Sequence, residues 1–127
     1  MEKYLPYRAP IEQFGAGGFR FAGMSHVGSL LILPSGMRVW RPTCITDVNA
    51  GDLESVIAEI SDVDFLLLGT GATMSRLPSA VSAHLTGHRI AHDAMSTSAA
   101  IHTYNVVLAE GRRVAAALIA VDKAHGN

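Results

Sequence analysis

The residues best placed to do chemistry in this chain are the Gly69-Thr70-Gly71 run, which offers two glycines and a hydroxyl. The apolar stretch at 65–68 predicts a buried strand just before the run, and ligands in open α/β sheets bind beyond the carboxyl ends of strands. The glycines would let a small ligand or an anion reach backbone N–H groups. The alternative is a tight structural turn, which glycine favours for steric reasons alone.

The second part of this candidate crevice is a predicted helix start that contains Asp93, Thr97 and Ser98. Helix N-termini attract anions, and the small side chains there would leave the helix end accessible. If the 69–71 turn lies beside this end, the two would frame one crevice. Asp93 is a candidate general base, although a helix cap explains it better, and Ser96 is the other candidate cap.

Two further patterns indicate structure rather than nucleotide binding. The 69–71 run lacks the third glycine of a dinucleotide-binding loop, because Met74 stands there, and no Gly-Lys-Ser/Thr follows. The Gly15-Ala16-Gly17-Gly18 run precedes Phe-Arg-Phe rather than a helix start, which favours a bulge or a hairpin.

Metal binding and nucleophilic catalysis are weakly supported. His84, His88 and His92 are four residues apart, but Gly87 interrupts the helix that would align them. Ser25 and His26 are adjacent, so in a strand they would point to opposite faces. No Gly-x-Ser-x-Gly sequence occurs. We therefore expect no metal, no cofactor and no catalytic residue.

Length and composition favour one globular domain. The chain has 127 residues, 49% of them apolar and 17% charged, with a net charge of −1, which gives no reason to expect nucleic acid as a partner. The single cysteine, Cys44, excludes an intrachain disulfide. We expect a flexible arm at 1–9, a domain at 10–122 and a tail at 123–127. Because no signal peptide or apolar run of about 20 residues is evident, we expect a cytoplasmic protein, or a mitochondrial matrix protein if the source is eukaryotic.

Apolar spacing and turn residues predict the elements that position these groups. Strands are expected at 26–33, 37–41, 65–68, 89–92 and 114–121. Helices are expected to begin at Asp52, at Pro78, and at Asp93 or Ser96. The alternation of helix and strand predicts an α/β fold, a single three-layer domain with a central mixed sheet, three helices and an N-terminal β-hairpin.

Several segments together resemble the mitochondrial complex I assembly factor 3-like family, a domain of unknown function that is widespread in bacteria. They are Phe19-Arg20-Phe21, the 28–34 strand with Trp40, the 69–71 turn, Leu77-Pro78, Asp93-Ala94-Met95, Thr103-Tyr104-Asn105-Val106 and the 110–114 segment. Ser98 and His102 depart from the glycine and arginine expected of many relatives. The resemblance implies a three-layer α/β fold and, for animal members, a role in building the respiratory NADH:ubiquinone oxidoreductase.

From this resemblance we expect a non-enzymatic assembly or stability factor for a respiratory or membrane complex. Its partners would be proteins, such as respiratory-complex or membrane-insertion components. Exposed aromatic residues would anchor that interface, and Phe19, Phe21 and Trp40 are the candidates, with packing inside the hairpin as the alternative. The competing class is a small-molecule or anion-binding protein, or an enzyme, that uses the crevice at 69–71 and near Asp93. Self-association through the hairpin edge is a third alternative.

Overall fold

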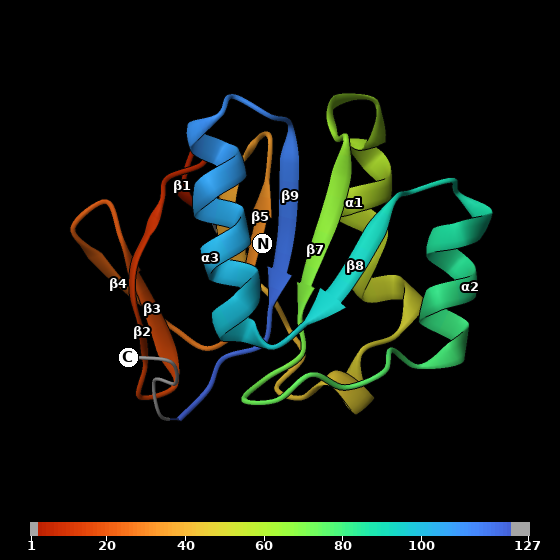
Figure 1. Cartoon of the computed structure of the whole chain (residues 1–127), viewed down its shortest axis with the longest axis horizontal. Helices are drawn as coiled ribbons and strands as arrows, with labels where there is room; N and C mark the ends of the chain where they lie inside the picture. The colour runs from red at the N-terminus through yellow and green to blue at the C-terminus, as the bar shows by residue number, and fades with distance from the viewer. Residues whose placement is uncertain (1–2, 123–127) are drawn as a thin grey trace.

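The computed structural model describes residues 3–122, which form two β-sheets and three α-helices (Figure 1). The main sheet has six strands in the order β1-β6-β5-β9-β7-β8. Their bounds are Lys3–Leu5 (β1), Leu30–Leu33 (β5), Gly36–Val39 (β6), Phe65–Gly69 (β7), His92–Met95 (β8) and Val114–Leu118 (β9). The second sheet is a meander of β2 (Ile11–Gly15), β3 (Gly18–Phe21) and β4 (Met24–Val27).

The main sheet is mixed. Strand β7 runs parallel to both of its neighbours, β8 and β9, whereas β5 runs antiparallel to β9 and to β6. All residues of β5 and β9 are buried, as are 66–69 of β7. A strand buried on both faces needs a continuous apolar sequence rather than an alternating one, which is what these three strands have.

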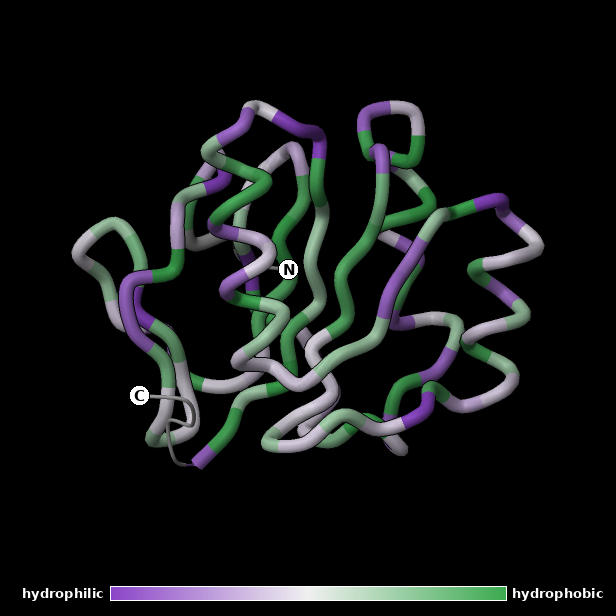
Figure 2. Tube along the Cα trace, viewed as in Figure 1, coloured by the Kyte–Doolittle hydropathy of each residue, from purple (hydrophilic) through white to green (hydrophobic). Residues whose placement is uncertain are grey.

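Helices cover both faces of the main sheet, so the domain has three layers. Helix α3 (Thr97–Ala109) and the meander lie on one face, where Leu67 packs with Ala100 and Tyr104. Helices α1 (Glu54–Ala58) and α2 (Ser79–Gly87) lie on the other face, where Leu66 and Leu68 form the second core. The most apolar segments are the strands between these layers (Figure 2). The α/β architecture predicted from the sequence is thus confirmed.

The glycine-rich run at 15–18 forms the tight turn between β2 and β3, as predicted. Ala16 and Gly17 have φ angles of 52° and 78°, in the left-handed region that a tight hairpin turn requires. Asn105 of α3 holds the free edge of this meander: its side chain accepts a hydrogen bond from the N–H of Ile11 (2.8 Å) and donates one to the carbonyl of Ile11 (3.0 Å). The amide therefore pairs with β2 as a neighbouring strand would.

Several predicted boundaries are wrong. The strand predicted at 26–33 is two strands in different sheets, because the chain breaks at Gly28, whose φ is 89°. The strand predicted at 89–92 is β8, shifted to His92–Met95, and the helix cap is Ser96, which accepts from the N–H of Ala99. The last strand ends at Leu118 instead of 121.

The start of the helical segment after β6 also differs from the prediction. Asn49, not Asp52, is the cap, and Asp52 completes a capping box by accepting from the Asn49 N–H. Three short 3-10 turns, Ile45–Asp47, Ala50–Leu53 and Ile60–Asp62, flank α1.

The expected N-terminal arm is in part a strand, since β1 pairs antiparallel with β6 at the sheet edge. Pro6 does not prevent this pairing, because it follows the last residue of β1. The first two residues of the expected arm and the expected tail at 123–127 lie outside the described residues.

Candidate functional site

The carboxyl ends of β7, β8 and β9 meet at one edge of the main sheet, because Gly69 lies in register with both Met95 and Leu118. The 69–71 turn leaves β7 at this edge and α3 begins directly beside it. The turn and the helix start therefore lie side by side, which is the condition that the crevice hypothesis required. Most of the contacts between them are internal hydrogen bonds.

Thr97 is the residue that joins the turn to the helix, and its side chain is fully buried. Its hydroxyl accepts from the N–H of Gly71 (3.0 Å) and donates to the carbonyl of Ile119 (2.7 Å). Its own N–H donates to the carbonyl of Gly71 (2.8 Å). Gly69 has no room for a side chain, since a Cβ there would lie 2.9 Å from the Thr97 hydroxyl oxygen. These contacts fill the space between turn and helix.

Thr70 is also engaged within the chain. Its N–H donates to the carbonyl of Met95 (2.8 Å), and its hydroxyl oxygen lies 2.8 Å from the carbonyl of Thr73 and accepts from the N–H of Ser75 (3.0 Å). These bonds fold the loop after β7 back on itself. The donors that the sequence suggested for an anion, the Gly71 N–H and the Thr70 hydroxyl, are thus used by the protein itself.

Asp93 lies away from the turn. It lies in β8, in register with Leu67, and its side chain is exposed. Ser98 is half-buried in the first turn of α3. The six residues expected to frame one crevice are therefore not one site. Gly69, Gly71 and Thr97 form a packed junction, and Thr70 lies against it. Asp93 and Ser98 lie at separate positions.

An open groove lies on the outer side of this junction. Its volume is about 590 Å³, and it is lined by residues 43–46, 70–72 and 119–122. We call it the turn groove. The 43–46 loop was not predicted as part of a site, since nothing in its sequence links it to a strand end 25 residues away. Cys44 in this loop is exposed, and its Sγ lies 3.3 Å from the Thr46 hydroxyl oxygen.

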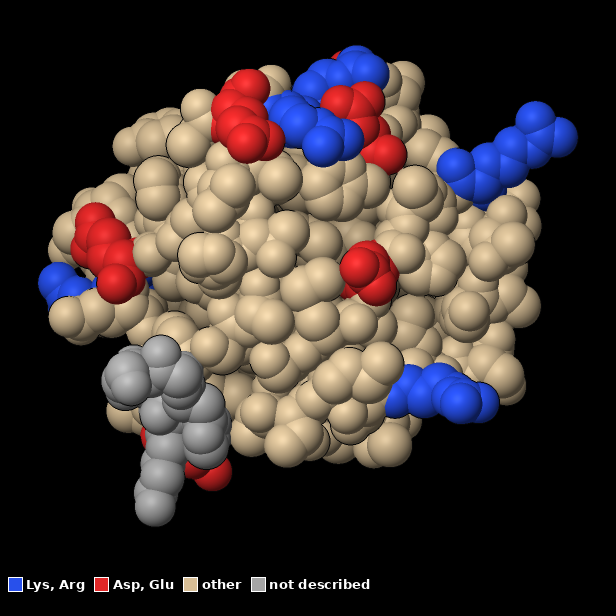
Figure 3. Space-filling model, in the orientation of Figure 1, with Lys and Arg blue, Asp and Glu red and all other residues tan. Residues whose placement is uncertain are grey.

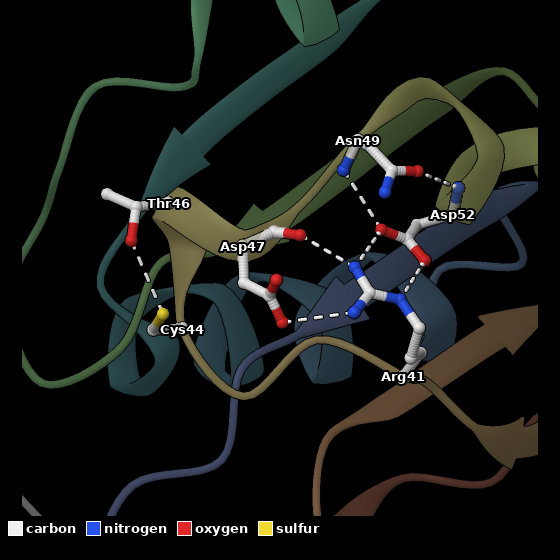
Figure 4. Close-up of polar contacts among 6 residues, drawn as sticks. All are labelled: Arg41, Cys44, Thr46, Asp47, Asn49 and Asp52. Atoms are coloured by element: carbon white, nitrogen blue, oxygen red, sulfur yellow. Dashed lines mark hydrogen bonds and ion pairs between the residues drawn. The ribbon is translucent and has the colours of Figure 1, made fainter.

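Ion pairs hold the loop that forms one wall of the turn groove (Figure 4). Both carboxylate oxygens of Asp52 accept from Arg41, at 2.7 and 2.8 Å, and Arg41 also donates to the Asp47 carboxylate at 3.1 Å. The hydrogen bond from Arg41 is the largest of the effects that hold the pKa of Asp52 below its ordinary value. Arg41 and the two carboxylates are thus paired with one another, which indicates a structural role.

The three aromatic residues expected to anchor an interface are buried: Phe19, Phe21 and Trp40 are 2%, 0% and 3% exposed. The expectation that they are exposed is therefore wrong. The two phenylalanines pack between the meander and α3, and the Trp40 indole donates to the carbonyl of Asp52 at 2.9 Å. The two phenylalanines thus fill the core at the contact between the two sheets, as the packing alternative predicted, whereas Trp40 fills the core on the other face of the main sheet.

The meander carries a second groove, of about 470 Å³, on its own strands. Phe14, Arg20 and Val27 are among the residues that line it. His26 at its floor is buried, with Nε2 at 2.9 Å from the carbonyl oxygen of Ser29. Its position and this contact assign His26 a packing role beneath the groove.

Within residues 3–122, no group of three His, Cys, Asp or Glu side chains is arranged to hold a metal ion. His84 on α2 and His88, the residue just after that helix, meet edge to face with ring centroids 4.7 Å apart, and His92 lies on β8. No helix in the same part of the chain is both long enough and apolar enough to cross a membrane.

A six-stranded mixed sheet with this order of helices defines an α/β fold that other proteins share. A Bordetella pertussis protein described as an Mth938-like domain has it with a TM-score of 0.76 and 24% identity, over 91% of this chain and 87% of that one. Residues 11–119 match the model of a family described as protein of unknown function (DUF498/DUF598). The chain belongs to this family.

Three proteins show how similar this chain is to others in sequence. An uncharacterized protein of Rhodobacter capsulatus is 39% identical over 87% of this chain and 83% of its own length. The zebrafish protein named NADH dehydrogenase [ubiquinone] 1 alpha subcomplex assembly factor 3 is 29% identical over 94% of this chain and 68% of its own. A Bartonella henselae structure titled as an outer membrane protein is 46% identical with a TM-score of 0.88, over 93% of this chain and 99% of that one. The predicted family resemblance is thus confirmed.

Proposed function

We propose that this protein is a non-enzymatic factor that helps to assemble or stabilise a respiratory or membrane complex by binding a protein partner. The support from sequence is the similarity to the zebrafish assembly factor, which extends over 94% of this chain. The name of that relative points to a role in assembly rather than catalysis. A cytoplasmic location forms part of this proposal.

The observation that carries the proposal is that the polar groups of the candidate crevice are already hydrogen-bonded within the protein. The polar groups that would have bound a substrate, namely the hydroxyls of Thr70 and Thr97 and the N–H of Gly71, are committed to bonds inside the protein. A catalytic site needs groups that are free to contact a substrate. Asp93, the one candidate base, lies apart from them, exposed on the edge strand β8.

Affinity capture of the tagged chain from its native cell, followed by mass spectrometry, tests the proposal. We expect enrichment of subunits of a respiratory or membrane complex over an untagged control. Enrichment of the enzymes of one metabolic pathway, with no such subunits, would contradict it.

The turn groove supports a second candidate, a small-molecule binding protein. The groove lies at the carboxyl ends of the parallel strands, where α/β proteins bind ligands, and its volume of about 590 Å³ suits a small molecule. Mass spectrometry of the protein under native conditions, after purification without denaturant, tests this alternative. A bound mass lost in an Ala72→Trp variant, whose side chain would enter the groove from an exposed position, would favour it over protein binding.

A further inference from the structure

Helix α3 lies on the surface yet carries no Asp, Glu, Lys or Arg in its 13 residues. Its outer side consists of Ala99, His102, Val106 and Ala109, which are spaced at helical intervals and are all exposed. Val106 is 44% exposed. An exposed helix face in a globular protein ordinarily carries charged residues, so this outer side is unusual.

The uncharged surface continues from α3 onto β8, the edge strand of the main sheet. Leu67 packs toward α3, and Asp93 is its neighbour in register on β8, so Asp93 points to the same side of the sheet. Met95 points the same way and lies 3.8 Å, through Sδ, from the Thr103 hydroxyl oxygen. Because α3 packs mainly on β7 and β9, this side of β8 is open.

Few charged side chains lie on the side of the molecule that α3 and β8 form. Figure 3 shows one acidic side chain near the middle of the face and the other charged side chains around its rim. Within residues 3–122 the Asp93 carboxylate makes no ion pair, whereas Asp47, Asp52 and Asp64 are all paired with arginine. We call the surface made by Asp93, Met95, Ala99, His102, Thr103 and Val106 the α3–β8 face.

We propose that the α3–β8 face binds a helix of the partner protein, and that this helix is uncharged where it makes contact except for one Lys or Arg that pairs with Asp93. This inference rests on the proposed function and names the surface it would use. A helix beside α3 would complete the layer above β8, and the small residues of α3 permit close approach.

Charge complementarity identifies the partner. Covering the face would remove the Asp93 carboxylate from water, and an unpaired carboxylate in an interface is strongly unfavourable. The partner must therefore supply a cation at this point and little charge elsewhere. A second copy of this chain that used the same face would bring two Asp93 carboxylates close together, which disfavours a symmetric dimer.

The test begins with a photo-crosslinking amino acid placed at His102 of the full chain in its native cell, and at Val27 as a control on the meander. Mass spectrometry of the crosslinked peptides then identifies the partner segment. We expect position 102 to crosslink to one uncharged helical segment that contains a single Lys or Arg. Crosslinks to a second copy of this chain, or to the same segment from position 27, would overturn the proposal.

Matched substitutions then test the face itself. Val106→Glu should reduce the amount of retained partner at least about tenfold, whereas Val27→Glu, at a valine that is 84% exposed, should leave it within about twofold. Asp93→Lys should also reduce it, and replacing the partner's single basic residue by Asp should restore binding to the Asp93→Lys variant. Equal retention by the two glutamate variants, or no restoration by the exchanged charges, would contradict the proposal.

The same experiments distinguish an error in the proposed function from an error in the binding face. If the charge exchange succeeds but the partner belongs to no respiratory or membrane complex, the α3–β8 face is correct and the proposed function is wrong. Unfolding midpoints of the Val106→Glu and Val27→Glu variants within a few degrees of the original protein show that the substitutions act on binding.

Discussion

Gly69 and Thr97 form the contact on which the geometry of the candidate site depends. The absent side chain of Gly69 allows α3 to begin against the end of β7, and the buried hydroxyl of Thr97 then closes hydrogen bonds to Gly71 and Ile119. From the sequence, the proximity of this turn to this helix start was a hypothesis only. The sequence did not predict that their polar groups bind one another, because that depends on a helix position fixed by the core.

Replacing Gly69 by alanine should destabilise the protein by about 1–3 kcal/mol. The new Cβ would lie 2.9 Å from the Thr97 hydroxyl oxygen and 3.0 Å from the Thr97 Cα, and the buried helix start cannot easily move. Urea unfolding measures the change. Gly87→Ala is the matched control, since nothing lies within 4 Å of a Cβ at the end of α2, and its effect should be within about 1 kcal/mol. Equal losses in the two variants would refute the close approach at Gly69.

The Thr97→Val substitution keeps the shape of the side chain and removes the hydroxyl. The Gly71 N–H and the Ile119 carbonyl would each lose a hydrogen bond in a buried position, so we expect a loss of about 2–3 kcal/mol in the free energy of unfolding. Thr103→Val in the same helix removes only a 3.8 Å contact with sulfur and should change stability by less than about 0.5 kcal/mol. Denaturant titrations of both variants would decide; a Thr97→Val variant as stable as Thr103→Val would disprove the role of the hydroxyl.

Among the elements, the buried strands and the helices were the most predictable parts. Continuous apolar runs give β7 and β9, and the 3.6-residue spacing gives the buried side of α3. The break at Gly28 and the burial of Phe19 and Phe21 were not predictable, because both follow from a second sheet that packs on the first. Trp40 is buried on the other face of the main sheet, against the segment that precedes α1.

The meander should depend on Asn105 for its attachment to α3. In an Asn105→Asp variant the carboxylate cannot donate to the carbonyl of Ile11, so the meander loses half of this pairing and gains repulsion between two oxygens. We expect a loss of about 1–3 kcal/mol and faster amide hydrogen exchange at residues of β2 than in the original protein. Unchanged exchange in β2 would show that the remaining contacts hold the meander.

The loop beside the turn groove should contribute stability that depends on pH through Asp52. Its pKa is lower in the folded protein than the ordinary value of about 3.9, so the contribution is complete above pH 4 to 5 and is lost as the pH falls through the folded pKa. Asp52→Asn should therefore be less stable than the original at pH 7, with a difference that shrinks below about pH 4.

Thermal unfolding of both proteins between pH 3 and pH 7 measures this difference. Asp64→Asn is the control, because the Asp64 pair with Arg113 is exposed at both side chains and should matter less. A difference for Asp52→Asn that stays constant down to pH 3 would rule out the ion pair as its source.

At the scale of the whole molecule, the three-layer fold leaves the α3–β8 face, as far as residues 3–122 show it, without Asp, Glu, Lys or Arg other than Asp93. The crevice first suggested as a site is closed by internal bonds. Both features favour a protein that acts by contact with another protein. The family and fold could be predicted from the sequence, because they depend on many residues together. The location of a binding surface could not, because it depends on which residues remain exposed after folding.

The most direct test of this account is the amount of assembled respiratory complex in the native cell when the gene is deleted, measured by native gel electrophoresis and activity staining. We expect the deletion to lower the assembled complex several-fold. The original chain and Val27→Glu should restore it, whereas Val106→Glu, although folded, should not. Undiminished assembly of these complexes in the deletion strain would contradict the central claim that the protein is an assembly or stability factor.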